Sequence, residues 1–92
     1  MEIKYNLNIY TKEDAYHLVD TLFNELYSYK KWNNEKDKML FLFTSQGADI
    51  RGDVKINENE LIIKGMVHPK KIYLSDSIES CLIDDLNKVF VN

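Results

Sequence analysis

The sequence predicts a single α+β domain over residues 1–92, a two-layer sandwich in which a four-stranded, largely antiparallel sheet carries two helices on one face. Three alternating stretches follow one another between Met39 and Val67, separated only by short polar turns. Two stretches with apolar residues three and four positions apart flank this region, over 12–29 and 75–90. A further alternating stretch opens the chain, so the expected order is strand, helix, three strands, helix.

The opening strand and the first helix follow from two different periodicities. Apolar and polar residues alternate from Glu2 to Ile9, which is typical of a strand with one buried face. Thr11 can cap a helix, and Asp14 three residues later gives a partial capping box, since Glu or Gln is usual there. The apolar stripe then predicts a helix from about Lys12 to about Tyr29. Its members are Ala15, Leu18, Val19, Leu22, Phe23, Leu26 and Tyr27.

A polar connection, KKWNNEKDK, is predicted from Lys30 to Lys38, with a turn signal at Asn33-Asn34. Trp32 is its one large apolar residue. We interpret Trp32 as a residue at the edge of the core in preference to a binding anchor, and both roles stay open.

The central meander is the clearest part of the pattern. Its first strand, from Met39 to Thr44, is apolar on both sides and is expected at the centre of the sheet. A turn at 45–47 leads to a second strand over 50–56, and a polar loop leads to a third over 61–67. Gly52 and Gly65 fall on the core side, where a missing side chain marks a bulge or room for a helix or a ligand.

The second helix is predicted after a proline at position 69, which ends the last strand. Ile72-Tyr73-Leu74 is interpreted as a short apolar bridge, and Ser75 as the cap of the helix. The stripe consists of Ile78, Leu82, Leu86 and Val89, and Cys81 is expected on the buried side.

Composition narrows the classes of function. Twelve basic residues are dispersed among 15 acidic ones and the net charge is −3, which argues against an extended nucleic-acid footprint. The single cysteine allows no disulfide within the chain. With no signal peptide and no apolar run near 18 residues, we expect no membrane span and a cytoplasmic protein.

Residues that carry chemistry are sparse. The two histidines, His17 and His68, are far apart in sequence, and no cluster of cysteine and histidine has the spacing of metal ligands. No motif ties Cys81 to a base that could activate it. We therefore expect a non-enzymatic protein with no catalytic residues, no metal ligands and no cofactor.

The sheet face turned away from the helices is the predicted contact surface. An apolar centre rimmed by charged side chains is typical of a binding face. We expect self-association as a homodimer, or a protein partner, through the sheet face or the second helix. The candidate interface residues are Leu40, Leu42, Ile62 and Met66, with Trp32 as a further candidate.

The layout resembles a family of small bacterial polyhydroxyalkanoic-acid-system (granule-region) proteins. The similarity lies in the order of elements, Trp32 before the meander, the phrase from Phe43 through Gly47 to Val54, and the apolar spacing from Ile72 to Leu86. It implies a non-enzymatic accessory role near storage-polymer granules, with a hydrophobic polymer surface as one partner. The family's usual histidine near the first helix is absent here, where Asn8 and Tyr10 stand, so no functional residue is carried over.

Two alternatives follow from other features. A carrier of a small apolar ligand would place a pocket between the layers beside Gly52 and Gly65. A nucleic-acid module would use Lys30, Lys31, Lys70 and Lys71, since the helix, three strands, helix order of residues 12–90 resembles the double-stranded RNA-binding domain. Against this, the stretch 75–77 is acidic where that domain presents lysines.

Overall fold

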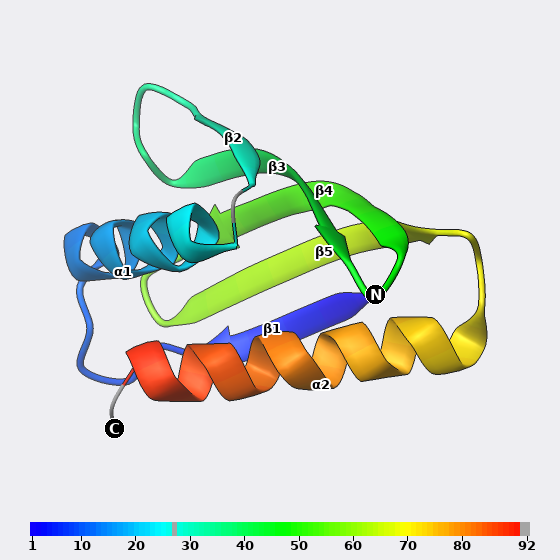
Figure 1. Ribbon diagram of the computed structural model, residues 1–92. Coiled ribbons are helices and arrows are strands. Elements are labelled where there is room, and N and C mark those ends of the chain that lie inside the picture. The colour runs from blue at the N-terminus through cyan, green and yellow to red at the C-terminus, as the bar shows by residue number, and fades with distance from the viewer. Residues whose placement is uncertain (27, 91–92) are drawn as a thin grey trace.

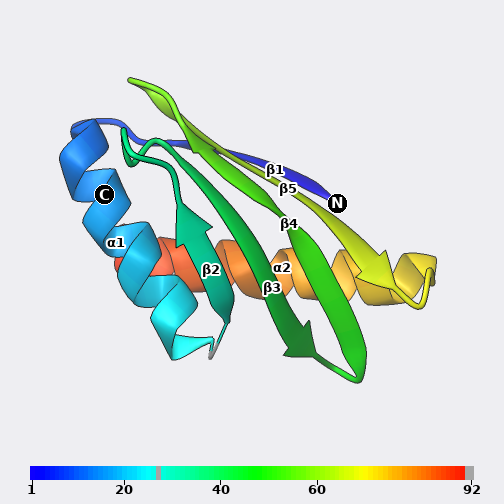
Figure 2. The ribbon, with the colours of Figure 1, turned by 90° about the horizontal axis from the view of Figure 1, so that it is seen from above.

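A computed structural model describes residues 1–26 and 28–90 of the chain (Figure 1). One antiparallel sheet holds five strands in the spatial order β1-β5-β4-β3-β2. Both helices pack on one face of this sheet, and no described element covers the other (Figure 2). The elements, in chain order, are β1 (Glu2–Asn6), α1 (Lys12–Glu25), β2 (Tyr29–Trp32), β3 (Lys38–Ser45), β4 (Ala48–Ile56), β5 (Glu60–His68) and α2 (Ile72–Val89).

The α+β class, the antiparallel meander and the two helices are confirmed, but the four-stranded sheet and its element order are wrong. The stretch predicted as a polar connection contains β2, which pairs with β3 through Tyr29 opposite Leu42 and Trp32 opposite Met39. Short, charged edge strands carry little apolar periodicity, so four residues with two lysines gave no strand signal. The connection between β2 and β3 is therefore shorter than predicted and covers only 33–37. Asn33 stabilises this turn, since its Oδ1 accepts hydrogen bonds from the amides of Asp37 and Lys38, both at 3.1 Å.

Helix α1 begins as predicted and ends earlier. The Thr11 hydroxyl accepts from the amide of Asp14 at 3.1 Å, and the Asp14 carboxylate accepts from the amide of Thr11 at 3.4 Å, so the capping box is complete. The helix ends at Glu25 with Leu26 as its C-cap, because Tyr29 belongs to the next strand. Tyr27, which the apolar stripe included, lies outside the described residues.

Helix α2 begins one turn earlier than predicted, and the assignment of Ser75 as its cap is wrong. The N-cap is Lys71, whose carbonyl accepts from the amides of Leu74 and Ser75 at 3.0 and 3.1 Å. Leu74 is buried and adds one turn to the i, i+4 stripe, so packing on the sheet explains the early start. Cys81 is exposed, which corrects its predicted burial.

A single apolar cluster fills the space between the layers. At its centre Phe23 of α1 contacts Phe41 and Phe43 of β3, with ring centroids 4.9 and 6.0 Å apart. Gly52 does not open a cavity there, because a Cβ at that position would lie 1.9 Å from the carbonyl oxygen of Lys64. The glycine instead lets the backbones of β4 and β5 approach closely. Among the described residues, no helix is long and apolar enough to cross a membrane.

Candidate functional site

The sheet face opposite the helices, here called the open face, presents a row of side chains across four strands. The register places Tyr29 of β2 opposite Leu42 of β3, Leu42 opposite Arg51 of β4, and Arg51 opposite Met66 of β5. Residues directly opposite in antiparallel strands share a face, with Cβ atoms about 5 Å apart. These four residues form a continuous row, which we call the contact ladder.

The apolar members of this surface are exposed. Tyr29 is 69% exposed, Met66 63% and Leu42 37%, and Leu40, two residues before Leu42 on the same face of β3, is 55% exposed. Large apolar side chains at such exposure on neighbouring strands are the feature that distinguishes a contact surface from scattered surface residues.

The structure brings together only part of the predicted interface. Leu40 and Leu42 lie side by side on β3, and Met66 joins them across Arg51. Ile62 is half-buried and stands apart, because the residues paired with it are Lys55 and Lys4. Trp32 lies on the helix-covered face and does not contribute to the open face.

Trp32 instead fixes β2 to α1. Its Nε1 donates to Oδ1 of Asp20 at 2.9 Å, and its ring contacts that of Tyr16 with centroids 4.7 Å apart. The ammonium of Lys30 also donates to the Asp20 carboxylate and forms an ion pair with it. Partial burial raises the pKa of Asp20, but the hydrogen bonds from Lys30 and Trp32 and the positive charges of Lys30 and His17 outweigh it, so the pKa is lowered. We call Asp20, Lys30 and Trp32 the α1–β2 latch.

Folding places more basic than acidic side chains on the open face, although the charges are dispersed in the sequence. The register puts six basic side chains on the open face, Lys4, Lys31, Lys38, Arg51, Lys55 and Lys64, and four acidic ones, Glu2, Asp49, Asp53 and Glu60. The ion pairs on this face are Lys38 with Asp53 at 3.7 Å and Lys64 with Glu2 at 3.6 Å. In a chain of net charge −3, the open face therefore carries a basic surplus.

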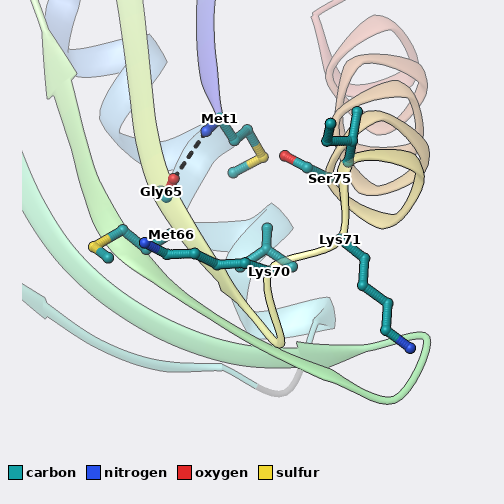
Figure 3. Close-up of a pocket in the computed structure, with 8 residues that line it drawn as sticks. Met1, Gly65, Met66, Lys70, Lys71 and Ser75 are labelled. Atoms are coloured by element: carbon teal, nitrogen blue, oxygen red, sulfur yellow. Dashed lines mark hydrogen bonds between the residues drawn. The ribbon is translucent and has the colours of Figure 1, made fainter.

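Two shallow grooves adjoin the contact ladder. One, of about 560 Å3, lies on the open face and is lined by Leu40, Arg51, Asp53, Lys64 and Met66 among others. The second, of about 340 Å3, lies between the end of β5 and the start of α2 (Figure 3). The four lysines predicted to bind nucleic acid do not gather at either groove. Lys30 lies in the α1–β2 latch, Lys31 on the open face, and Lys70 and Lys71 at the second groove.

The remaining candidates for chemistry are separated in space as well as in sequence. His17 and Cys81 are exposed on different helices, and His68 is exposed at the end of β5. Gln46 Nε2 donates to Cys81 Sγ at 3.8 Å, and Gln46 Oε1 accepts from Ser77 at 2.9 Å, so the β3–β4 turn rests on α2. Within residues 1–26 and 28–90, no three of the His, Cys, Asp and Glu side chains could together hold a metal ion.

Comparisons with protein-family models, with curated proteins and with solved structures found no match to this chain. Tyr29 is not predicted on the open face, because the first helix is expected to extend to about this residue. The four residues of β2, Tyr29-Lys30-Lys31-Trp32, show no alternation of apolar and polar residues, so the sequence carries no signal for this strand.

Proposed function

We propose that this protein is a non-enzymatic binding module that acts through the open face and assembles through it as a homodimer. The observation that supports this is the contact ladder, a row of exposed side chains that no described element covers. Tyrosine, methionine and arginine, three of the four residue types in the ladder, are enriched at protein interfaces.

We infer the room for a dimer interface from the extent of the sheet. The open face spans five strands of four to nine residues, and the whole chain measures 35 × 27 × 19 Å between its Cα atoms. A standard interface buries roughly 800 Å2 per partner. Face-to-face packing of two sheets also places side chains between layers about 10 Å apart, which suits leucine and methionine.

The test is the solution mass of the protein across a concentration series, measured by light scattering. Leu42→Asp places a carboxylate at the centre of the ladder, and Ile9→Asp makes the same change at an 89% exposed residue outside the sheet. The proposal expects a dimer for the parent and for I9D, and a monomer for L42D. A parent chain that stays monomeric, or an L42D variant that dimerises like the parent, contradicts it.

The resemblance to the polyhydroxyalkanoate granule-region proteins supports an accessory role at storage-polymer granules as the setting of this binding. Leu40, Leu42 and Met66 would offer such a surface, or a protein on it, an apolar contact area. A fluorescently tagged chain expressed in granule-forming cells tests this setting. Accumulation on granules that L42D abolishes and I9D keeps supports it, and a diffuse signal for the parent counts against it.

A further inference from the structure

The groove between β5 and α2 is lined mainly by apolar and basic side chains. Its apolar side chains are Met1, Met66, Val67 and Ile72, and its floor includes Gly65, which has no side chain. Ile72 is 85% exposed and Met66 63%, so these walls are open to solvent. Figure 3 shows the Met1 side chain turned toward the groove, with its backbone nitrogen donating to the carbonyl of Gly65 at 3.0 Å.

The charged side chains of the groove are all basic. Lys70 and Lys71 line it, Ser75 supplies a hydroxyl, and no carboxylate is present, although acidic residues outnumber basic ones in the chain. Neither lysine forms an ion pair within the described part of the chain. Lys70 extends along the groove toward Met66, whereas Lys71 points away (Figure 3).

Apolar and basic side chains also line the surface next to this groove. An adjoining groove of about 350 Å3 shares Met66, Val67 and Lys70 and adds Arg51 and His68, with Asp49 as its one acid. Lys70 and Arg51 thus flank Met66 from two sides. An anion held there would have cations on both sides and apolar walls beyond them.

We propose that this groove binds a single-chain anionic amphiphile, with its acid group at Lys70 and its apolar chain along Met66, Val67 and Ile72. A purely apolar ligand would cover lysine without supplying a partner for its charge, which costs free energy. A small inorganic anion would gain nothing from the apolar walls. A volume near the lower end for ligand sites, about 300–1,000 Å3, favours one chain over a two-chain lipid. The groove and its neighbour share Met66 and Arg51 with the contact ladder, but neither Tyr29 nor Leu42 lines them, so L42D tests the dimer without removing a groove residue.

The test uses three probes that separate the two parts of the ligand, each below its micelle concentration. Dodecanoate carries both the acid and the chain, dodecyltrimethylammonium carries the same chain with a cationic head, and acetate carries the acid alone. Binding is followed by amide chemical shifts in a ¹⁵N titration. We expect dodecanoate to shift the amides of Met66, Val67 and Ile72, and the other two probes to leave them unmoved.

Two variants and two matched controls complete the experiment. Lys70→Glu and Ile72→Ser should each weaken dodecanoate binding at least about tenfold, through the lost charged contact and the lost apolar wall. Lys88→Glu and Ile9→Ser make the same changes at exposed residues outside the groove and should leave the affinity unchanged. All four should keep the parent's solution mass, so failure of this site is distinguishable from failure of the dimer.

Three results would overturn the proposal. Equal shifts with the cationic probe would indicate unspecific adsorption of the chain. Loss of binding in I9S as large as in I72S would place the site elsewhere. Binding of the protein to phosphatidylglycerol vesicles with no response to monomeric dodecanoate would replace the groove with a lipid surface.

Discussion

Removing the Asp20 carboxylate should weaken the attachment of the edge strand β2 to α1. Asp20 accepts hydrogen bonds from Trp32 Nε1 and from the Lys30 ammonium, and Lys30 Nζ also donates to the Asp20 carbonyl at 3.1 Å. In Asp20→Ala, Trp32 Nε1 loses its acceptor and Lys30 keeps only the backbone carbonyl, while the Trp32 ring remains packed against Tyr16.

The size of the effect follows from exposure. A buried donor left without a partner costs about 1–3 kcal/mol. The side chains of Lys30 and Asp20 are 17% and 30% exposed, so water can replace part of what is lost. We therefore expect the free energy of unfolding to fall by about 1–2 kcal/mol. Asp84→Ala removes an exposed carboxylate from α2 and should change it by less than about 0.5 kcal/mol.

The assay is urea unfolding followed by the fluorescence of the single tryptophan and by circular dichroism. A D20A variant as stable as D84A would refute the latch. A double-mutant cycle with Trp32→Phe, which removes the indole N–H, should show a coupling of about 0.5–1.5 kcal/mol between the two positions. Additive effects would mean that Trp32 and Asp20 act independently.

The remaining predictions concern pH, packing, glycine positions and salt. Because the folded-state pKa of Asp20 is lowered, the latch stabilises the fold at pH values above the unfolded-state pKa of this carboxyl. This stability is lost as the pH falls through the folded-state pKa. The urea midpoint should therefore drop less in D20A than in the parent between pH 6 and pH 3. Phe23→Ala leaves a cavity against Phe41 and Phe43 and should cost about 3–5 kcal/mol by urea unfolding. Gly52→Ala drives a Cβ to 1.9 Å from a backbone carbonyl and should cost at least about 3 kcal/mol, whereas Gly47→Ala, at φ +77° with no neighbour within 4 Å, should cost about 1 kcal/mol. If two basic open faces meet in the dimer, raising the salt concentration from 50 to 500 mM should lower the dissociation constant of the dimer, because salt screens the repulsion between like charges. A higher dissociation constant at 500 mM salt would instead indicate pairing of opposite charges across the interface.

The parts of the fold that sequence predicts are those with long, unambiguous periodicity. The meander from Met39 to Val67 and the stripe of α1 each direct one row of apolar side chains into the core, so hydrophobic spacing determines them. The errors lie where packing overrides local signals. Ser75 is a good capping residue, yet α2 starts at Ile72 because Leu74 has a place in the core.

The residues of the candidate site were likewise predicted only where strand periodicity places them. The alternation of β3 and β5 predicts that Leu40, Leu42 and Met66 share a face, and the structure exposes all three. Sequence could not add Tyr29, because strand pairing rather than periodicity brings it beside Leu42. Strand periodicity places Lys4, Arg51, Lys55 and Lys64 on the open face, but it could not add Lys31, because β2 was not predicted.

The central claim is that the open face is the surface through which this protein binds a second copy. The most direct test is a map of methyl and amide chemical shifts from dilute to concentrated protein, read at Leu40, Leu42 and Met66 on that face and at Ile9 and Cys81 away from it. The account predicts shifts that grow with concentration at the first three residues and stay constant at the last two. Shifts confined to α2, or none on the open face, would contradict it.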